Sequence, residues 1–266
     1  MTPIRTLLAL IPVTCLLACS SVAAADPAAP ASPAGDFRFQ KVVAAGTKVS
    51  IHDMNGAVTF EPASGDTLEV VAVKTGRQSD LGRVQVVSRE EGGTLFFCAL
   101  WPGQEASTCR EGGPRGSSHQ DVEVNVEFRV RLPAKVAAVN VLTMNGLVRA
   151  KEVHGDVNLR TMNGLIDVDA TGTIVAETSN GAVTAKAAAG KTVRLHTNNG
   201  KVALTLPAGA GADVDAATTN GRISSDFVDV PPPAMPALHA AKFKIGSGGT
   251  AISLHTTNGD VRVQRL

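Results

Sequence analysis

The fold of this chain is decided by residues 141–168, which read VLTMNGLVRAKEVHGDVNLRTMNGLIDV. The motif Thr-Met-Asn-Gly-Leu occurs twice in this stretch, 18 residues apart. Asn-Gly recurs seven times in the chain, and four consecutive spacings from Asn145 are 18, 17, 19 and 21 residues. Such a period is typical of stacked repeats. The seven pairs are Asn55 with Gly56, Asn145 with Gly146, Asn163 with Gly164, Asn180 with Gly181, Asn199 with Gly200, Asn220 with Gly221, and Asn258 with Gly259.

The residues that flank each Asn-Gly pair are repeated as well. The third residue after every Asn is Val or Ile, and the second residue before it is Thr everywhere except at Asp53. Side chains alternate between the two faces of a strand, and the inward parity changes at Asn-Gly. This change indicates a chain corner, where Gly supplies a positive φ and Asn tolerates one. A second signal at half the period, at Gly155, Gly172 and Gly190, predicts two short strands per repeat.

Two arrangements of these strands compete. Asn-Gly is a strong signal for an antiparallel hairpin. Hairpins do not require the same Thr and aliphatic residue at fixed offsets, whereas stacked coils do, because each coil presents like residues to its neighbours. The sequence therefore predicts an all-β fold, a parallel β-solenoid of the β-helix or β-roll kind with repeats of about 18–20 residues. We expect inward-facing Thr and Asn side chains to form ladders between the coils.

The composition agrees with a thin core between β-sheets. Of the 266 residues 44% are hydrophobic, but only 3% are aromatic, with no Tyr and a single Trp. Small and β-branched side chains must therefore fill the core. The chain carries 25 Lys and Arg residues against 24 Asp and Glu residues, with no basic run. This balance argues against a nucleic-acid-binding protein, which needs excess cations to displace counterions from phosphates.

The N-terminal segment predicts export. Arg5 precedes an apolar run over residues 7–18 that is too short to span a bilayer. Two cleavage sites remain open, a lipoprotein-type site with a signal peptide over residues 1–19 that acylates Cys19, and an ordinary site after residue 25. We expect lipidation at Cys19 and an envelope lipoprotein facing the periplasm or the outer surface, with a soluble periplasmic or secreted protein as the alternative. Residues 20–36, rich in Ala, Pro and Ser, predict a tether.

Two further parts follow the tether, residues 37–134 and residues 135–266. The period lapses in the first part, where alternating segments predict strands that we expect to be antiparallel and to cap the first coil. The second part is expected to form the Asn-Gly solenoid. Cys98 and Cys109 remain after signal removal, and export leads to an oxidising compartment, so we predict a disulfide between them. The alternating segments are residues 67–74, 83–89, 94–101 and 121–132.

The repeated string Thr-x-Asn-Gly-x-Val/Ile, together with ISLHTTNGDV at residues 252–261, resembles the bacterial "putative adhesin" family of secreted β-strand-repeat proteins, a domain of unknown function. The resemblance covers residues 37–266. It implies the repeat architecture and an adhesin-like role, and it brings no catalytic residues with it.

Two groups of polar residues are candidate sites. His52, His196 and His255 share the outward position three residues before Asn, but their repeats are not consecutive and no acidic or Cys residue recurs with them. We therefore expect solvated histidines and no metal site. Paired carboxylates would be needed for a carbohydrate-cleaving enzyme, and the acidic residues of the central repeats are interpreted as solvated instead. These acidic residues are Asp156, Asp167, Asp169 and Glu177.

The apolar residues at outward positions are more distinctive. Met144, Leu147, Met162 and Leu165 occupy equivalent outward positions of adjacent repeats, which indicates a binding stripe unless residues 121–132 or a terminal segment cover it. No catalytic residue, metal or cofactor is predicted. The sequence thus favours a non-enzymatic, adhesin-like or scaffold protein of the cell envelope whose rigid β surface binds an envelope protein or surface ligand. The alternative is a polysaccharide-active or otherwise catalytic β-solenoid.

Overall fold

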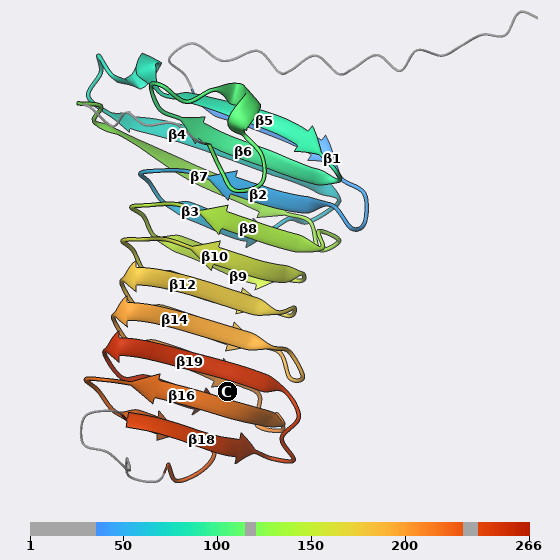
Figure 1. Ribbon diagram of the computed structural model, residues 1–266. Coiled ribbons are helices and arrows are strands. Elements are labelled where there is room, and N and C mark those ends of the chain that lie inside the picture. Colours follow the sequence, from blue (N-terminus) through green and yellow to red (C-terminus); the bar gives the residue numbers. More distant parts are fainter. Residues whose placement is uncertain (1–35, 115–120, 231–238) are drawn as a thin grey trace, which may run out of the picture.

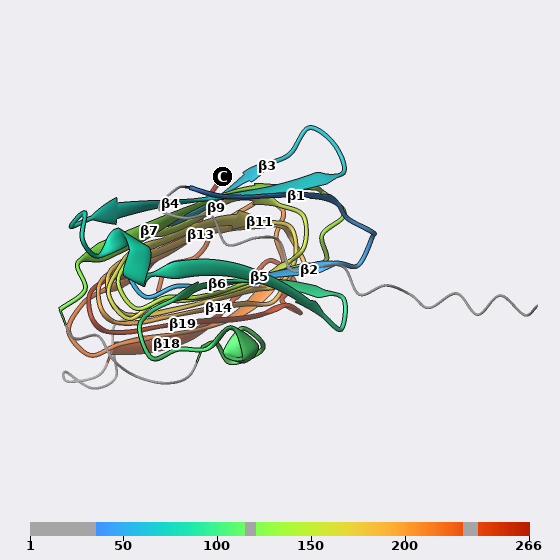
Figure 2. The ribbon, with the colours of Figure 1, turned by 90° about the horizontal axis from the view of Figure 1, so that it is seen from above.

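The computed structural model describes residues 36–114, 121–230 and 239–266. In this part of the chain two ten-stranded sheets lie face to face and form a tall, flat stack (Figures 1 and 2). The described helices are two single 3₁₀ turns, η1 (Leu81–Arg83) and η2 (Ala106–Thr108), and no described helix is long and apolar enough to cross a membrane. The predicted all-β fold with parallel sheets is confirmed. The predicted signal peptide, Cys19 and nearly all of the predicted tether lie outside the described residues.

Sheet A and sheet B each run the length of the stack. In spatial order sheet A contains β1 (Phe37–Val42), β4 (Thr67–Gly76), β7 (Val124–Leu132), β3 (Val58–Pro62), β9 (Val148–Val153), β11 (Ile166–Ala170), β13 (Val183–Ala187), β15 (Val202–Leu206), β20 (Val261–Arg265) and β17 (Ile223–Ser225). Sheet B contains β18 (His239–Ile245), β16 (Ala212–Thr218), β19 (Ala251–Asn258), β14 (Val193–Asn199), β12 (Ile174–Asn180), β10 (Asp156–Arg160), β8 (Ala138–Leu142), β2 (Lys48–His52), β6 (Thr94–Leu100) and β5 (Gln85–Glu91).

A coil of the stack is one strand of sheet B, an Asn-Gly corner and the next strand of sheet A. Equivalent aliphatic residues of neighbouring coils are register partners: Val148 pairs with Ile166, Ile166 with Val183, and Val183 with Val202. All four are fully buried between the sheets. Because each strand contributes alternate aliphatic side chains to this layer, the core is thin and needs few aromatic rings.

The order of the coils in space differs from their order in the sequence at both ends. Strands β19 and β20 lie between β14 and β16 and between β15 and β17, so the C-terminal coil is inserted before the coil that precedes it in the chain (Figure 1). Strands β2 and β3 likewise lie between the β8–β9 coil and the strands β6 and β7. Stacking in sequence order, implicit in the repeat argument, is therefore correct only for the central coils.

The expectation of an antiparallel cap before residue 134 is only partly correct. Strand β5 pairs antiparallel with β6, and β4 pairs antiparallel with β1 and β7. Strands β6 and β7, however, run parallel to β2 and β3 and continue the stack by one more layer. At the other end β18 pairs antiparallel with β16. Antiparallel strands thus close both sheets at one end of the stack and sheet B at the other, where sheet A ends on the parallel strand β17.

The corner glycines serve mainly to let neighbouring coils approach. A Cβ atom added to Gly164 would lie 2.0 Å from the carbonyl oxygen of Gly146, and one added to Gly181 would lie 2.2 Å from that of Gly164. The positive φ expected from the sequence occurs at only some corners, for example at Gly181 with φ of 150°. Close backbone approach, common to all seven corners, is therefore the stronger reason for Gly here.

Two side-chain ladders run along the corners, and their placement corrects the prediction that both Thr and Asn point inward. The Thr residues are buried, and the Thr197 hydroxyl, for example, donates to the Gly181 carbonyl of the next coil at 2.9 Å. The Asn side chains lie at the rim, where the chain turns, and all but Asn55 belong to exposed residues. Six hydrogen bonds of 2.7–2.8 Å between side-chain amides nevertheless join them in the spatial order Asn220, Asn258, Asn199, Asn180, Asn163, Asn145 and Asn55.

Candidate functional site at the disulfide loop

A disulfide pins a loop onto the outer face of sheet B near its N-terminal end. The predicted Cys98–Cys109 disulfide is confirmed, with the two Cα atoms 5.8 Å apart. The cysteines form a small second core with Phe96 and Leu100, against which Val87 packs. The chain that follows β6, residues 101–114, is called the disulfide loop here, and it crosses in front of the sheet (Figure 1). A Cβ on its Gly113 would lie 3.2 Å from Leu142 and 3.3 Å from His52, so the loop rests directly on both residues.

His52 lies beneath this loop, which contradicts its interpretation as a solvated histidine. Its ring is buried, its Nε2 lies 3.0 Å from the Ser50 hydroxyl, and its Nδ1 faces Cys98 Sγ at 3.8 Å. Burial lowers the pKa of His52 to about 4, because the charged imidazolium would lose its hydration. The histidine is therefore neutral at pH 7. The outward position of His52 on its strand was predicted. The disulfide loop that covers its side chain lies outside the repeat pattern and was not.

Asp53 replaces the corner Thr in the coil under the loop. Because His52 pairs with Cys98 and Leu142, the next residue, Asp53, lies beside Ala99 and Thr143. The two carboxylate oxygens of Asp53 and the Thr143 hydroxyl are shielded from solvent and have no side-chain hydrogen-bond partner among the described residues; only the backbone amides of Met54 and Asn55 interact with the carboxylate. Burial raises the pKa of Asp53 well above its ordinary value, and the nearby backbone amides of Met54 and Asn55 oppose the rise only in part.

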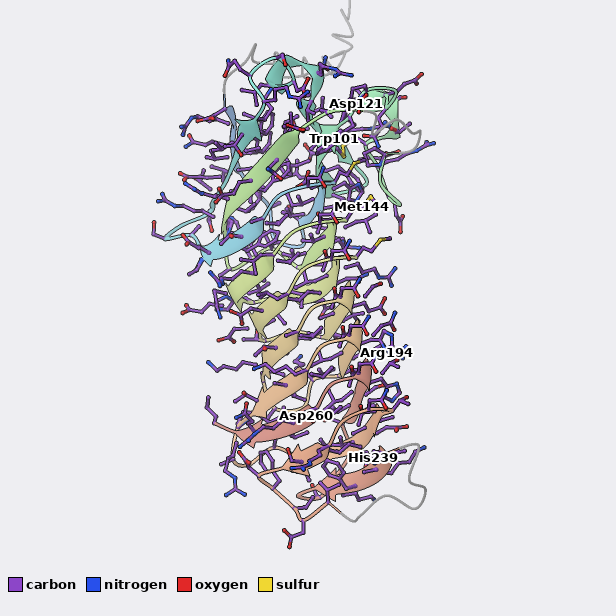
Figure 3. The ribbon with its side chains drawn as sticks, turned by 90° about the vertical axis from the view of Figure 1, so that its left-hand side faces the viewer. Trp101, Asp121, Met144, Arg194, His239 and Asp260 are labelled. Atoms are coloured by element: carbon purple, nitrogen blue, oxygen red, sulfur yellow. A yellow bond between two sulfur atoms is a disulfide. The ribbon has the colours of Figure 1, made fainter. Side chains whose placement is uncertain are left out.

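An apolar pocket of about 210 Å³ opens between the loop and this corner. Trp101 and Pro114 of the loop region face Met54, Leu142 and Met144 of two coils across it, and Figure 3 shows Met144 below Trp101 on the corner edge of the stack. Trp101 is only 2% exposed. Asp53 and Thr143 also line this pocket. Two unpartnered polar groups thus border an otherwise mainly apolar space.

A second, more polar recess of about 370 Å³ lies on the other side of the same loop. Ser50, Asn140 and Asn158 form a row across its floor, because they are register partners on β2, β8 and β10. Lys48 and Glu111 also line the recess. The Asn158 side-chain oxygen is shielded and has no hydrogen-bond partner among the described residues. His52 and Leu142 border both spaces, so the loop separates two recesses of different polarity.

The apolar stripe is present at the corner edge next to these recesses. Met162 and Leu165 are 48% and 44% exposed, while Met144 and Leu147 are half-buried. Leu142, which the repeat pattern did not single out, is 41% exposed beside them. The strand over residues 121–132, considered as a possible cover, forms β7 in sheet A and continues the stack. Leu142, Met144, Leu147, Met162 and Leu165 are called the apolar stripe below.

The acidic residues considered for catalysis are not brought together. Asp167 and Asp169 lie on sheet A, whereas Asp156 and Glu177 lie on sheet B. Asp167 pairs with Arg149 and Lys151, Asp169 with Lys186, and Glu177 with Arg160, at 2.8–3.5 Å. Asp156 accepts a hydrogen bond from the Thr173 amide at 2.7 Å. Their arrangement is that of ion pairs between neighbouring strands.

Insertion of the C-terminal coil changes the relation between two of the histidines. His196 and His255 were placed in non-consecutive repeats, yet they are direct register partners on β14 and β19. The His255 Nε2 lies 3.8 Å from Asp215. The described residues contain no group of three or more His, Cys, Asp or Glu side chains suited to a metal ion.

Sequence comparison places this architecture in a family. The model of the family described as Toastrack DUF4097 matches residues 46–264, which include most of the stack but not the edge strand β1. The chain belongs to the Toastrack DUF4097 family. Among curated proteins, none matches it.

Solved structures that resemble this Toastrack chain are distant in sequence. One is described as a "putative cell adhesion protein" of Clostridium sporogenes, with 12% identity, 87% of this chain and 100% of that chain covered, and a TM-score of 0.46. Another is a "putative adhesin" of Bacteroides fragilis, with 13% identity, coverage of 87% and 97%, and a TM-score of 0.37. A third is a "putative lipid binding protein" of Parabacteroides distasonis, with 9% identity, coverage of 86% and 97%, and a TM-score of 0.30. The family assignment therefore rests on the sequence match.

Proposed function

We propose that this Toastrack protein is a non-enzymatic, adhesin-like binding protein of the cell envelope that recognises its partner through the apolar stripe. The observation that carries the proposal is the exposure of Met162 and Leu165 on the two sides of one Asn-Gly corner, next to the half-buried Met144 and Leu147 of the adjacent coil. Large apolar side chains grouped at the surface of a soluble domain mark interaction sites more often than single ones do. Met side chains adapt to the shape of a partner, which suits such a surface.

The scaffold beneath the stripe supports this role. Asn145 and Asn163 lie between the apolar residues of the stripe. Their side chains are joined by a hydrogen bond of 2.8 Å, and further hydrogen bonds of the Asn ladder continue on both sides. The backbones of the same coils are hydrogen bonded, for example from the Val148 amide to the Leu165 carbonyl at 3.0 Å. Side chains on so constrained a backbone lose little further backbone entropy on binding, which favours recognition by a preformed surface.

Location in the envelope is part of the proposal and rests on the N-terminal sequence. An apolar run followed by Cys19 and an Ala/Pro/Ser-rich segment suits export, lipidation and a tether. Replacing Cys19 by Ala should move the protein from the membrane fraction to the soluble fraction of host cells. A Cys19→Ala protein that still sediments with membranes would remove the lipid anchor from the proposal and leave the stripe unaffected.

The stripe is tested by placing charge on it. We expect the double variant Met162→Lys, Leu165→Lys to lose about tenfold or more in apparent affinity for envelope fractions of the host, measured by cosedimentation, because two desolvated lysines are costly at an interface. Val42→Lys is the matched control, since Val42 is 67% exposed on β1, away from the stripe. Thermal unfolding of each variant establishes that it is folded. Wild-type affinity in the double variant would overturn the proposal.

A further inference from the structure

The one break in the Thr column coincides with the apolar pocket. Five of the six corner Thr hydroxyls donate to a Gly carbonyl of the neighbouring coil. Thr143 does not, and it is the one that lies beside Asp53. Both side chains line the pocket closed by the disulfide loop. Six corners carry Thr and the seventh carries the carboxyl of Asp53. The hydrogen bond from a Thr hydroxyl to a Gly carbonyl is therefore absent at the corner where the pocket opens.

The carboxyl lacks a cation among the residues described around it. The pocket is lined by His52, which is neutral at pH 7, and otherwise by apolar and uncharged side chains, with no Lys or Arg. Burial of an unpaired carboxylate is unfavourable, which is why the pKa of Asp53 is raised. A group that brings its own positive charge and hydrogen-bond donors would supply what the site lacks.

We propose that this pocket binds a primary ammonium group on a short alkyl stem, with Asp53 as the counterion. The stem would lie against Met54, Leu142 and Met144, and Trp101, which also lines the pocket, would be the aromatic side chain beside the cation. The ammonium has three N–H donors, and Asp53 and the Thr143 hydroxyl oxygen can accept two of them. The Asp53 oxygens are shielded in the free protein, so binding includes a turn of this carboxyl from its own corner toward the pocket.

This chemistry has two sources, a free alkylamine and the side chain of a lysine in a peptide or protein. The inference does not depend on the proposed function: Leu142 and Met144 belong to both surfaces, but Met162 and Leu165, whose exposure carries the proposed function, do not line the pocket. Its ligand group is small enough for a pocket of about 210 Å³, and unlike a sugar ring or a lipid tail it carries the positive charge that would neutralise the carboxylate.

Trp101 makes the test direct, because it lines the pocket and is the only Trp in a chain without Tyr. Its fluorescence is titrated with n-butylammonium, with Nα-acetyl-lysine methylamide and with n-butanol at one pH and ionic strength. We expect a saturable change with n-butylammonium and about tenfold weaker binding of n-butanol, which lacks the charge. A response to the lysine derivative as well identifies a lysine side chain as a ligand. A response to the free amine alone restricts the site to small amines.

Two variants complete the experiment. Asp53→Thr restores the residue of the other six corners, so it is expected to fold, and Asp53→Asn keeps the size of the side chain without its charge. Both should weaken n-butylammonium binding by about tenfold or more. The proposal is overturned by absence of a saturable response in the wild type, by equal binding of n-butanol, or by wild-type affinity in either folded variant.

Discussion

Asn258 donates a side-chain hydrogen bond of 2.7 Å to Asn199, although 59 residues separate them in the chain. Asn258 in turn accepts a bond of 2.7 Å from Asn220, its neighbour on the other side. The C-terminal coil therefore lies inside the stack. It connects the Asn ladder between two coils whose residues come earlier in the sequence. The last segment of the chain thus joins the penultimate coil to the rest of the fold.

The position of each Asn in the ladder predicts its contribution to stability. Replacing Asn258 by Ala removes two side-chain hydrogen bonds of the ladder, whereas replacing Asn220 by Ala removes one. At about 1 kcal/mol per net hydrogen bond, we expect losses of roughly 2 and 1 kcal/mol in the free energy of unfolding. Urea denaturation of the two variants measures the difference. Equal losses would contradict an internal position for Asn258.

Corner glycines should differ sharply from other glycines. Gly164→Ala places a Cβ 2.0 Å from the Gly146 carbonyl oxygen, so neighbouring coils must separate, and we expect a loss above about 4 kcal/mol or failure to fold. Gly65→Ala is the matched control, because its added Cβ meets nothing within 4 Å, and it should change stability by less than about 0.5 kcal/mol. Thermal and urea unfolding compare the two. A soluble Gly164→Ala protein of wild-type stability would refute the close-approach argument.

Asp53→Thr is expected to stabilise the protein at pH 7, by about 1–3 kcal/mol, because it removes a buried, unpartnered carboxyl. The folded-state pKa of Asp53 is raised, so protonation of Asp53 favours the folded state. This contribution to stability is fully present below the unfolded pKa of 3.8. That stability is lost as the pH rises through the folded pKa. The advantage of the variant should therefore grow from pH 4 to pH 7. A difference in unfolding free energy that is independent of pH would contradict this account.

His52 should make the fold sensitive to acid. Its pKa falls from 6.5 to about 4 on folding, so the unfolded chain takes up the proton first as the pH drops. Stability is lost progressively between pH 6.5 and pH 4, by up to about 3 kcal/mol, since each unit of pKa corresponds to about 1.4 kcal/mol. His52→Gln removes the titrating group, and its stability should fall less over this window. Parallel pH profiles of the two proteins, measured by urea denaturation, would show that the histidine is not responsible.

The disulfide is expected to stabilise the loop that borders both recesses. Cys98 and Cys109 are 11 residues apart, for which loop entropy predicts about 3 kcal/mol. The double variant Cys98→Ser, Cys109→Ser should lose that amount, and Trp101 fluorescence should shift as the indole becomes exposed. Dithiothreitol added to the wild type should reproduce both effects and leave the variant unchanged. An unchanged melting temperature on reduction would contradict the prediction.

Much of this fold could be predicted from local pattern, because the pattern is set by strand geometry. The aliphatic residue three positions after each Asn indicated which side chains, such as Ile166 and Val183, share a face, and these two are register partners. The disulfide followed from export and from the presence of two remaining cysteines. Asp53 was visible as the one exception among the corner Thr residues, although its pocket was not, because Trp101 reaches that corner through a loop outside the repeat.

The strands, their inward faces and the corners between them could be predicted from sequence, since alternation and turn chemistry act over a few neighbouring residues. The neighbours of each coil could not, because corners that carry the same Asn and Gly fit one another equally well and do not specify a neighbour. The tertiary structure decided these neighbours, and also that His52 is covered and that His196 lies beside His255. Both depend on long-range placement of the disulfide loop and the C-terminal coil, which a repeated local pattern does not encode.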